Sequence, residues 1–268
     1  MDRFYHKTLG ATAGLNFMNF DRRPSSHNLF PAKGNEKKDL DIYFFEDKNN
    51  VILKKMKKSD VGKNIKKATG GQYLEFFDIE RKKAFCFFKG RISMDFLVGR
   101  QLYRSFIAFQ NFLDMIFLHS ASIVVGGKLY LFAASSGGGK STICDLARKD
   151  GLKVLDDEFC VIKRKRGRFY TGVFPCFKAP FDPYEERQLE GIFFLEKSKR
   201  NKIRTISTNE AINRALPEAT SLPYDYASGR ERSEYRKHVF RFLNSVLEKT
   251  DFGLLEFNKD TYDFSCLN

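Results

Sequence analysis

A glycine-rich loop between an apolar run and a segment of helical pattern carries the residues best able to do chemistry in this chain. Its three consecutive glycines, 137–139, allow backbone N–H groups to point at phosphate oxygens without a Cβ in the way. Lys140 would reach the outer phosphates of a nucleotide, and the Ser141 hydroxyl would ligate Mg²⁺. The residues expected to contact the nucleotide are Ser135, Ser136, Gly137, Gly138, Gly139, Lys140, Ser141 and Thr142.

The loop departs from the usual phosphate-binding pattern at one position. That pattern has glycine six residues before the lysine, and this chain has Ala134 there. An alanine requires only that this residue avoid positive φ. The alternative is a glycine-rich turn that binds nothing. Because strand, glycines, Lys-Ser and helix occur in the required order, the sequence favours a nucleotide-phosphate site.

Two adjacent aspartates, Asp156 and Asp157, follow the next apolar run, Leu152–Leu155. Ligands gather at the carboxyl ends of strands in open α/β sheets, so this position suits a second part of the site. Phosphoryl transfer needs charge neutralisation and a group that receives the acceptor's proton. Neighbouring side chains on a strand point in different directions, so one carboxylate can assist Mg²⁺ while the other serves as base. Asp156 is our first choice for the base; a simple turn is the alternative.

Composition excludes several classes of protein. The 268 residues supply enough apolar side chains for a sizeable core. Five cysteines without Cys-x-x-Cys spacing, and four histidines, support neither a disulfide framework nor a zinc site. We find no targeting segment and no long uninterrupted apolar stretch. We therefore expect a soluble, cytoplasmic protein with no membrane partner.

The chain is strongly basic, with 47 Lys and Arg against 33 Asp and Glu and a net charge of +14. Such a charge favours anionic partners, although an ordinary solvated surface explains it equally well. If the partner is an acidic peptide, we expect it to bind the turn that contains Arg164, Lys165, Arg166 and Arg168. With 29 Phe and no Trp, the aromatic residues are expected to fill the core.

Apolar patterning predicts a division into two parts. Residues 1–40 read as loops with one short strand at most, and the short apolar runs between residues 40 and 90 predict a small antiparallel sheet. Apolar residues at helical spacing predict a helix over 95–118 that links the parts. We place a small β-rich domain at 1–94 and a second domain at 95–268.

The second domain is expected to alternate strands and helices. Two strands joined by Gly126-Gly127 predict a hairpin leading into the glycine loop, and a second hairpin turns at residues 164–167. Further strands are expected at 152–155, 191–195, 203–206 and 254–257, and helices at 141–149, 208–216 and 231–249.

These segments resemble the HPr kinase/phosphorylase-like proteins, whose nucleotide site is similar to that of phosphoenolpyruvate carboxykinase. The matching stretches are 118–121, 132–142, 154–158 and 191–196. The resemblance implies an α/β fold, in which a mixed-sheet P-loop kinase domain follows the small β-rich N-terminal domain. It also implies a serine kinase that uses ATP and Mg²⁺.

Carried over by position, the resemblance assigns further roles. Lys140 binds phosphates, Ser141 binds the metal, Asp156 or Asp157 acts as base, and Asp157 assists the metal. His119 would lie near the reaction centre, with a purely structural histidine as the alternative. A further acidic metal ligand is expected just before the strand at 191, where Glu186 and Glu190 are available; Glu190 is our choice.

The signature that follows the loop in kinases acting on HPr is not found here, so HPr is not the expected acceptor. The chain resembles more closely shorter kinases that phosphorylate free serine or a serine in a ribosomally made peptide. We therefore expect ATP-dependent phosphorylation of a serine in an acidic peptide or small protein. The alternatives are a small-molecule kinase for free serine or a sugar, and an ATP-sensing nucleic-acid-binding regulator. Nucleic acid is disfavoured because no nucleic-acid-binding motif is present; a homo-oligomer is left open.

Overall fold

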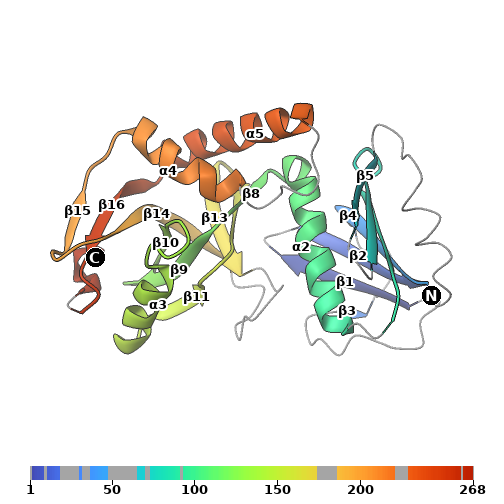
Figure 1. Ribbon diagram of the computed structural model, residues 1–268, viewed down its shortest axis with the longest axis horizontal. Coiled ribbons are helices and arrows are strands. Elements are labelled where there is room, and N and C mark those ends of the chain that lie inside the picture. Colours follow the sequence, from blue (N-terminus) through green and yellow to red (C-terminus); the bar gives the residue numbers. More distant parts are fainter. Residues whose placement is uncertain are drawn as a thin grey trace. The chain divides into compact units, whose positions relative to one another are not determined.

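The computed structural model describes residues 2–8, 11–18, 30–31, 37–47, 65–69, 73–90, 93–173, 186–220, 229–260 and 262–267 (Figure 1). The chain divides into two compact units, the first ending at Leu113 and the second beginning at Asp114. This division falls after the helix that we expected to open the second domain, rather than before it at 94/95. None of the helices within the described ranges has the length and apolar character needed to cross a bilayer.

The first unit contains a mixed sheet of seven strands in the order β3-β1-β2-β4-β7-β6-β5. The strands are β1 Asp2–Thr8, β2 Ala11–Met18, β3 Phe30–Pro31, β4 Leu40–Glu46, β5 Ile65–Thr69, β6 Tyr73–Asp78 and β7 Lys83–Phe88. The prediction of loops over residues 1–40 is wrong, because three strands lie there. The antiparallel prediction for residues 40–90 is correct for β5, β6 and β7 and wrong for β4, which pairs in parallel with both β2 and β7. The apolar run at 51–53 lies outside the described residues.

Helix α2, Met94–Leu113, packs against this first sheet. The ring of Phe109 lies 6.3 Å from that of Phe77, and the buried Arg104 guanidinium lies 2.6 Å from the Glu75 carboxylate. These contacts explain why the helix groups with the first unit.

The predicted helix over 95–118 ends early. Asp114 adopts a φ of 49°, and the following residues form strand β8, Met115–Leu118, which pairs with β12. All four β8 side chains are buried. A short, wholly apolar run fits a buried helix end or a buried strand equally well, so periodicity could not separate them.

The second unit is built on a mixed sheet whose main path is β11-β9-β10-β14-β13-β12-β8, with β16 added beside β14 and β15 beside β16. The strands are β9 Ser120–Val125, β10 Lys128–Ala133, β11 Lys153–Asp156, β12 Cys160–Lys165, β13 Arg168–Val173, β14 Glu186–Lys197, β15 Lys202–Arg204 and β16 Asp251–Phe257. The helices are α3 Lys140–Lys149, α4 Thr208–Thr220 and α5 Gly229–Leu247, followed by a 3₁₀ turn, Phe264–Leu267.

Both predicted hairpins are confirmed. β9 and β10 pair antiparallel across Gly126-Gly127, and β12 and β13 pair across the turn at 166–167. β10 also pairs in parallel with β14 on its other side, so the strand before the glycine loop has one antiparallel and one parallel neighbour.

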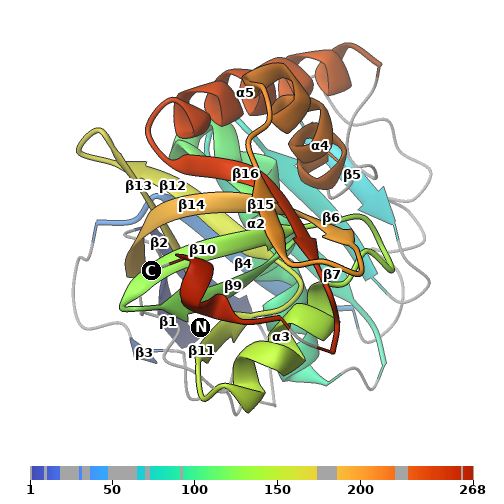
Figure 2. The same ribbon diagram turned by 90° about the vertical axis from the view of Figure 1, so that its left-hand side faces the viewer.

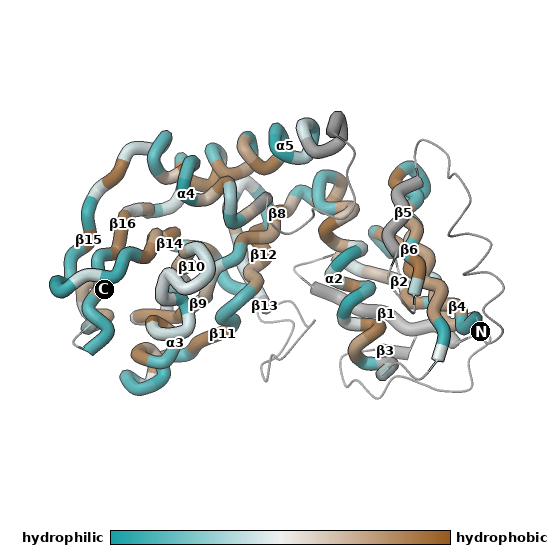
Figure 3. The backbone as a smooth tube through the Cα atoms, viewed as in Figure 1, coloured by the Kyte–Doolittle hydropathy of each residue, from teal (hydrophilic) through white to brown (hydrophobic). Residues whose placement is uncertain are grey.

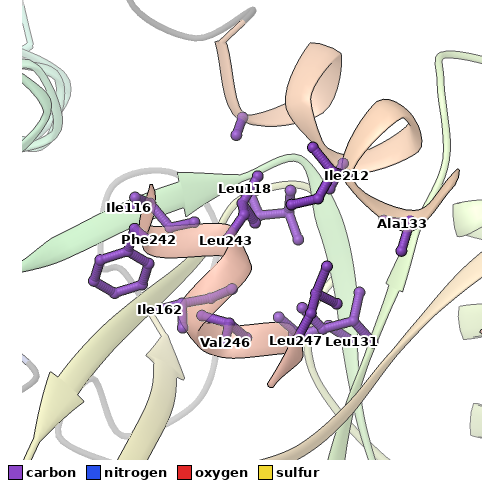
Figure 4. Close-up of a cluster of buried hydrophobic side chains, with 14 of the residues drawn as sticks. Ile116, Leu118, Leu131, Ala133, Ile162, Ile212, Phe242, Leu243, Val246 and Leu247 are labelled. Atoms are coloured by element: carbon purple, nitrogen blue, oxygen red, sulfur yellow. The ribbon is translucent and has the colours of Figure 1, made fainter. Parts of the chain in front are cut away.

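Helices cover both faces of this second sheet, as Figure 2 shows. On one face, α4 and α5 pack against side chains such as Leu118 and Leu131 (Figure 4). On the other face, Ile143 and Ala147 of α3 pack with Phe132 and the C-terminal 3₁₀ turn. Successive residues along β10 and just after it pack on opposite faces, with Leu131 and Ala133 in the first cluster and Phe132 and Ala134 in the second. Because these residues are anchored on both faces of the sheet, they fix the start of the glycine loop at the carboxyl end of β10.

A half-buried histidine, His238, makes the stability of this unit depend on pH. His238 on α5 lies 3.3 Å from the Met115 carbonyl oxygen, and burial lowers the pKa of its ring despite that hydrogen bond. As pH falls, the unfolded chain takes up a proton at this histidine before the folded chain does, so the free energy of unfolding decreases below about pH 6.5.

His238→Gln should therefore flatten this pH dependence, because a glutamine amide can still donate to a carbonyl but does not titrate. Urea unfolding of both proteins at several pH values between 5 and 7.5 measures the effect. An equally steep loss of stability in the variant would show that other groups cause it.

Candidate functional site

The glycine loop joins β10 to α3 in a conformation that needs its glycines. Gly137 and Gly139 have φ values of 76° and 112°. A Cβ on Gly139 would also lie 2.6 Å from Cζ of Phe257, so strain and crowding both exclude a larger residue. A Cβ on Gly138 would lie 2.6 Å from the Cβ of Ala134. Ala134 itself is not among the positive-φ residues, so alanine is tolerated at the loop entrance.

Lys140 is the first residue of α3 and folds back over this loop. Its Nζ donates to the Ala134 carbonyl oxygen at 2.5 Å and lies 3.4 Å from that of Ser135. The side chain is buried, and desolvation lowers the pKa of the amine, while the nearby carboxylates of Glu218 and Glu158 act in the opposite direction. The amine is thus held where the loop and the helix N-terminus meet, the place that suits an anion.

A pocket of about 430 Å³ opens at this loop. Its lining residues are His119, Ser136, Gly137, Gly139, Lys140, Ser141, Thr142, Asp157, Glu158 and Lys197. Most of the predicted site residues are therefore brought together. Ser135, Gly138 and Asp156 are not part of this lining, although they adjoin it in the chain. Glu158 and Lys197 are additional lining residues that the sequence analysis did not select.

The two aspartates occupy different environments. Oδ1 of Asp156 accepts hydrogen bonds from the backbone N–H groups of Glu158, at 2.8 Å, and Phe159, at 3.1 Å. Burial raises the pKa of Asp156 to about 6, although these bonds favour its charged form. Asp157 lines the pocket, and its Oδ2 lies 3.4 Å from the Arg148 guanidinium. Our first choice of Asp156 as base therefore fits this geometry less well than Asp157, because the Asp156 carboxylate is engaged in the turn.

His119 has a carboxylate partner from a distant part of the chain. Its Nδ1 lies 3.0 Å from Oε2 of Glu218, and its backbone N–H donates to the Glu218 carbonyl oxygen at 3.4 Å. Its ring also lies against that of Phe159, 5.6 Å between centroids. Because Nδ1 is hydrogen-bonded to Glu218, Nε2 is the ring nitrogen of His119 that can interact with a molecule in the pocket.

Sequence reasoning missed Glu218 because it ended the helix at Leu216, before Pro217. In the structure α4 continues through Pro217 to Thr220 and carries Glu218 with it. A proline usually marks a helix boundary, so no signal in the chain pointed to this residue.

The predicted acidic metal ligand is not in the pocket. Because Ala133 pairs with Phe194, Glu190 lies four residues before the level of the loop, roughly 13 Å along the strand at ~3.3 Å per residue. Its carboxylate pairs instead with Lys128 at 3.3 Å, and that of Glu186 pairs with Lys165 at 3.1 Å. The prediction of Glu190 as a ligand that joins Ser141 and Asp157 is therefore wrong, since the parallel register carries it to the other end of β10.

The turn predicted to bind an acidic acceptor also lies away from the pocket. β12 starts beside Phe159 and His119 and ends five residues later at Lys165, roughly 17 Å along the strand. Two of its four charges already have carboxylate partners: Arg164 lies 3.4 Å from Asp114, and Lys165 lies 3.1 Å from Glu186. This placement removes the reason for assigning the acceptor to that turn.

Within the described ranges, no group of three His, Cys, Asp or Glu residues is arranged to hold a metal ion by itself. A magnesium ion bound together with nucleotide needs fewer protein ligands, because phosphates and water supply the rest. Ser141 and the acidic pair Asp157 and Glu158 line the same pocket and fit that requirement.

Comparison with known proteins places the chain in a family. No curated protein matches it. A family model described as SynChlorMet cassette protein ScmC matches residues 99–250, more than half of the chain, and this range contains the glycine loop and almost all of the second unit up to β16. By this match, the chain belongs to the ScmC family of SynChlorMet cassette proteins.

Proposed function

We propose that this protein is an ATP-dependent kinase that transfers the γ-phosphoryl group to a serine hydroxyl of a peptide or small protein. One observation carries the proposal. A single pocket joins the glycine loop and Lys140, at the N-terminus of α3, with Asp157 and His119 from two other segments. A phosphate-binding loop alone would fit a nucleotide sensor, whereas a carboxylate and an imidazole facing it fit transfer to an acceptor.

The second unit is, in this proposal, a P-loop kinase domain of the HPr kinase and phosphoenolpyruvate carboxykinase type. The antiparallel hairpin before the loop, the acidic pair after β11, and β14 beside β10 support that reading. The family description names a cassette and no chemistry, so the reaction rests on the pocket.

In the proposed transfer, different residues of the pocket stabilise the phosphates, accept the proton and position the acceptor. The loop N–H groups and the Lys140 ammonium stabilise the charge on the phosphates, and the N-terminus of α3 adds its partial positive charge. Asp157 takes the proton of the serine hydroxyl as the new O–P bond forms and the bond to the ADP oxygen breaks. His119, held by Glu218, positions the acceptor hydroxyl beside Asp157.

Magnesium would be held by Ser141 together with Glu158, which leaves the Asp157 carboxylate to act as the base. The ion would neutralise charge on the phosphates when bound. The pocket residues fit this role because a hydroxyl and a carboxylate are oxygen ligands, which Mg²⁺ prefers.

Glu218→Gln should lower the rate of transfer by about tenfold while leaving the KM for ATP unchanged, since it removes the carboxylate that orients His119. When His119 is already replaced in His119→Gln, adding Glu218→Gln should not lower the rate of transfer further, because Glu218 acts through His119. Glu210→Gln, on the same helix but paired with Arg214, is the control. Additive losses in the double variant would show that Glu218 acts independently of His119.

Two other functions remain as alternatives. A kinase for free serine or a sugar would use the same residues, and only the acceptor separates it from a peptide kinase. An ATP-sensing regulator that binds nucleic acid would bind ATP but would not need Asp157 or His119 facing the phosphates.

The test is incubation with γ-labelled ATP and Mg²⁺ in the presence of free serine, serine peptides of acidic and neutral sequence, and HPr. Label on a serine of a peptide supports the proposal, and label on free serine alone supports the small-molecule kinase. Binding of ATP with transfer to none of these acceptors would contradict the proposed activity.

A further inference from the structure

Four cations cluster where β14 meets β15, beside the pocket. Lys197 ends β14 and lines the pocket, and Lys199, Arg200 and Lys202 follow within five residues. All four are exposed, and the chain trace coloured by hydropathy is hydrophilic at the turn between β14 and β15 (Figure 3). We call these four residues the basic ridge.

The basic ridge has few direct carboxylate contacts, although Glu256 lies opposite Lys202 across the β15–β16 pair. Among the residues that the structure describes, no carboxylate forms an ion pair with any of the four. Nearby carboxylates have other partners: Glu196 lies 3.7 Å from Arg214, and Glu256 lies 3.7 Å from Arg204. The turn at the end of β12 differs, because two of its cations, Arg164 and Lys165, form ion pairs with carboxylates. The ridge therefore offers four exposed cations without a direct ion pair, and the first of them, Lys197, lines the pocket.

Backbone and side-chain hydrogen bonds hold the ridge in place. The Ser198 N–H donates to the Phe257 carbonyl oxygen at 2.9 Å. Asn258 clamps the turn from both sides, donating from its backbone N–H to Oδ1 of Asn201 at 2.7 Å and from its side chain to the Lys199 carbonyl oxygen at 3.3 Å. A turn that is already ordered loses little entropy when a partner binds.

We propose that the basic ridge binds an acidic segment of the peptide acceptor and so brings its serine to the pocket. This inference rests on the proposed function, whose acceptor it defines: a peptide with several Asp or Glu residues near the target serine. Lys197 is the link, because it belongs to both the ridge and the pocket wall. The segment 197–204 contains no aromatic residue, so it lacks the stacking surface that single-stranded nucleic acids use.

The test measures binding directly, so that it does not depend on transfer. A fluorescent serine peptide with four flanking Glu residues is titrated with wild type and with the ridge variant Lys199→Gln/Arg200→Gln/Lys202→Gln. The control variant is Lys165→Gln/Arg166→Gln/Arg168→Gln, which removes the same number of positive charges from the turn at the end of β12. Each protein is also titrated with a fluorescent ATP analogue. Lys197 stays unchanged because it lines the pocket.

We expect the ridge variant to bind the acidic peptide about tenfold more weakly, with unchanged ATP affinity, and the control to bind like wild type. Raising salt from 0.05 to 0.5 M should reduce the difference, since screening weakens exposed charge pairs. Equal losses in both variants, or none in the ridge variant, would overturn the proposal. So would stronger ridge-dependent binding of a single-stranded oligonucleotide of equal charge. A failure of the proposed function would be seen separately, as wild type that binds peptide but not ATP.

Discussion

Lys140→Ala is expected to lower ATP turnover by ~10²-fold or more while the protein remains folded. The buried ammonium is held at the junction of the loop and α3, where developing charge on the transferred phosphoryl group needs a cation. The alanine methyl group replaces the aliphatic stem only in part, so a small loss of stability accompanies the loss of turnover.

The matched control for this change is Lys149→Ala. Lys149 lies exposed in the last turn of the same helix, so its removal deletes one positive charge from α3 without touching the loop. Turnover and thermal unfolding are measured for all three proteins. Wild-type turnover in Lys140→Ala would rule out a phosphate site at this loop.

Asp157→Asn is expected to reduce phosphoryl transfer by ~10²- to 10⁴-fold with little change in ATP affinity, because asparagine cannot accept the proton of the serine hydroxyl. Asp145→Asn is the control, since Asp145 and Asp157 share Arg148 as partner, at 3.0 and 3.4 Å. If Asp157 mattered only through its contact with Arg148, Asp157→Asn and Asp145→Asn would lower the transfer rate equally.

Asp156→Asn tests which of Asp156 and Asp157 acts as the base. The asparagine oxygen can still accept the backbone N–H groups of Glu158 and Phe159, so the turn is expected to persist and transfer to fall much less. Single-turnover rates and ATP binding are measured for both variants. A larger loss in Asp156→Asn than in Asp157→Asn would return the role of base to Asp156.

The amino-acid sequence by itself determined the local features of this protein. The glycine loop, the Gly126-Gly127 hairpin, the strand before Asp156 and the amphipathic helix near the C-terminus were all predictable, because turn chemistry and periodicity act over a few neighbouring residues. Lys140, Ser141 and Asp157 could be selected as candidates for the same reason, since each lies directly after a strand or in the first turn of the helix that follows the loop.

Only the tertiary structure decided which distant residues share the pocket. Glu218 reaches His119 because α4 continues past Pro217, and Lys197 lines the pocket because β14 runs parallel to β10 and ends beside the loop. The same register carries Glu190 to the opposite end of the strand, where it pairs with Lys128. Strand pairing and helix packing join residues that are far apart in the chain, and a period of two or 3.6 residues contains no information about the neighbour across the sheet.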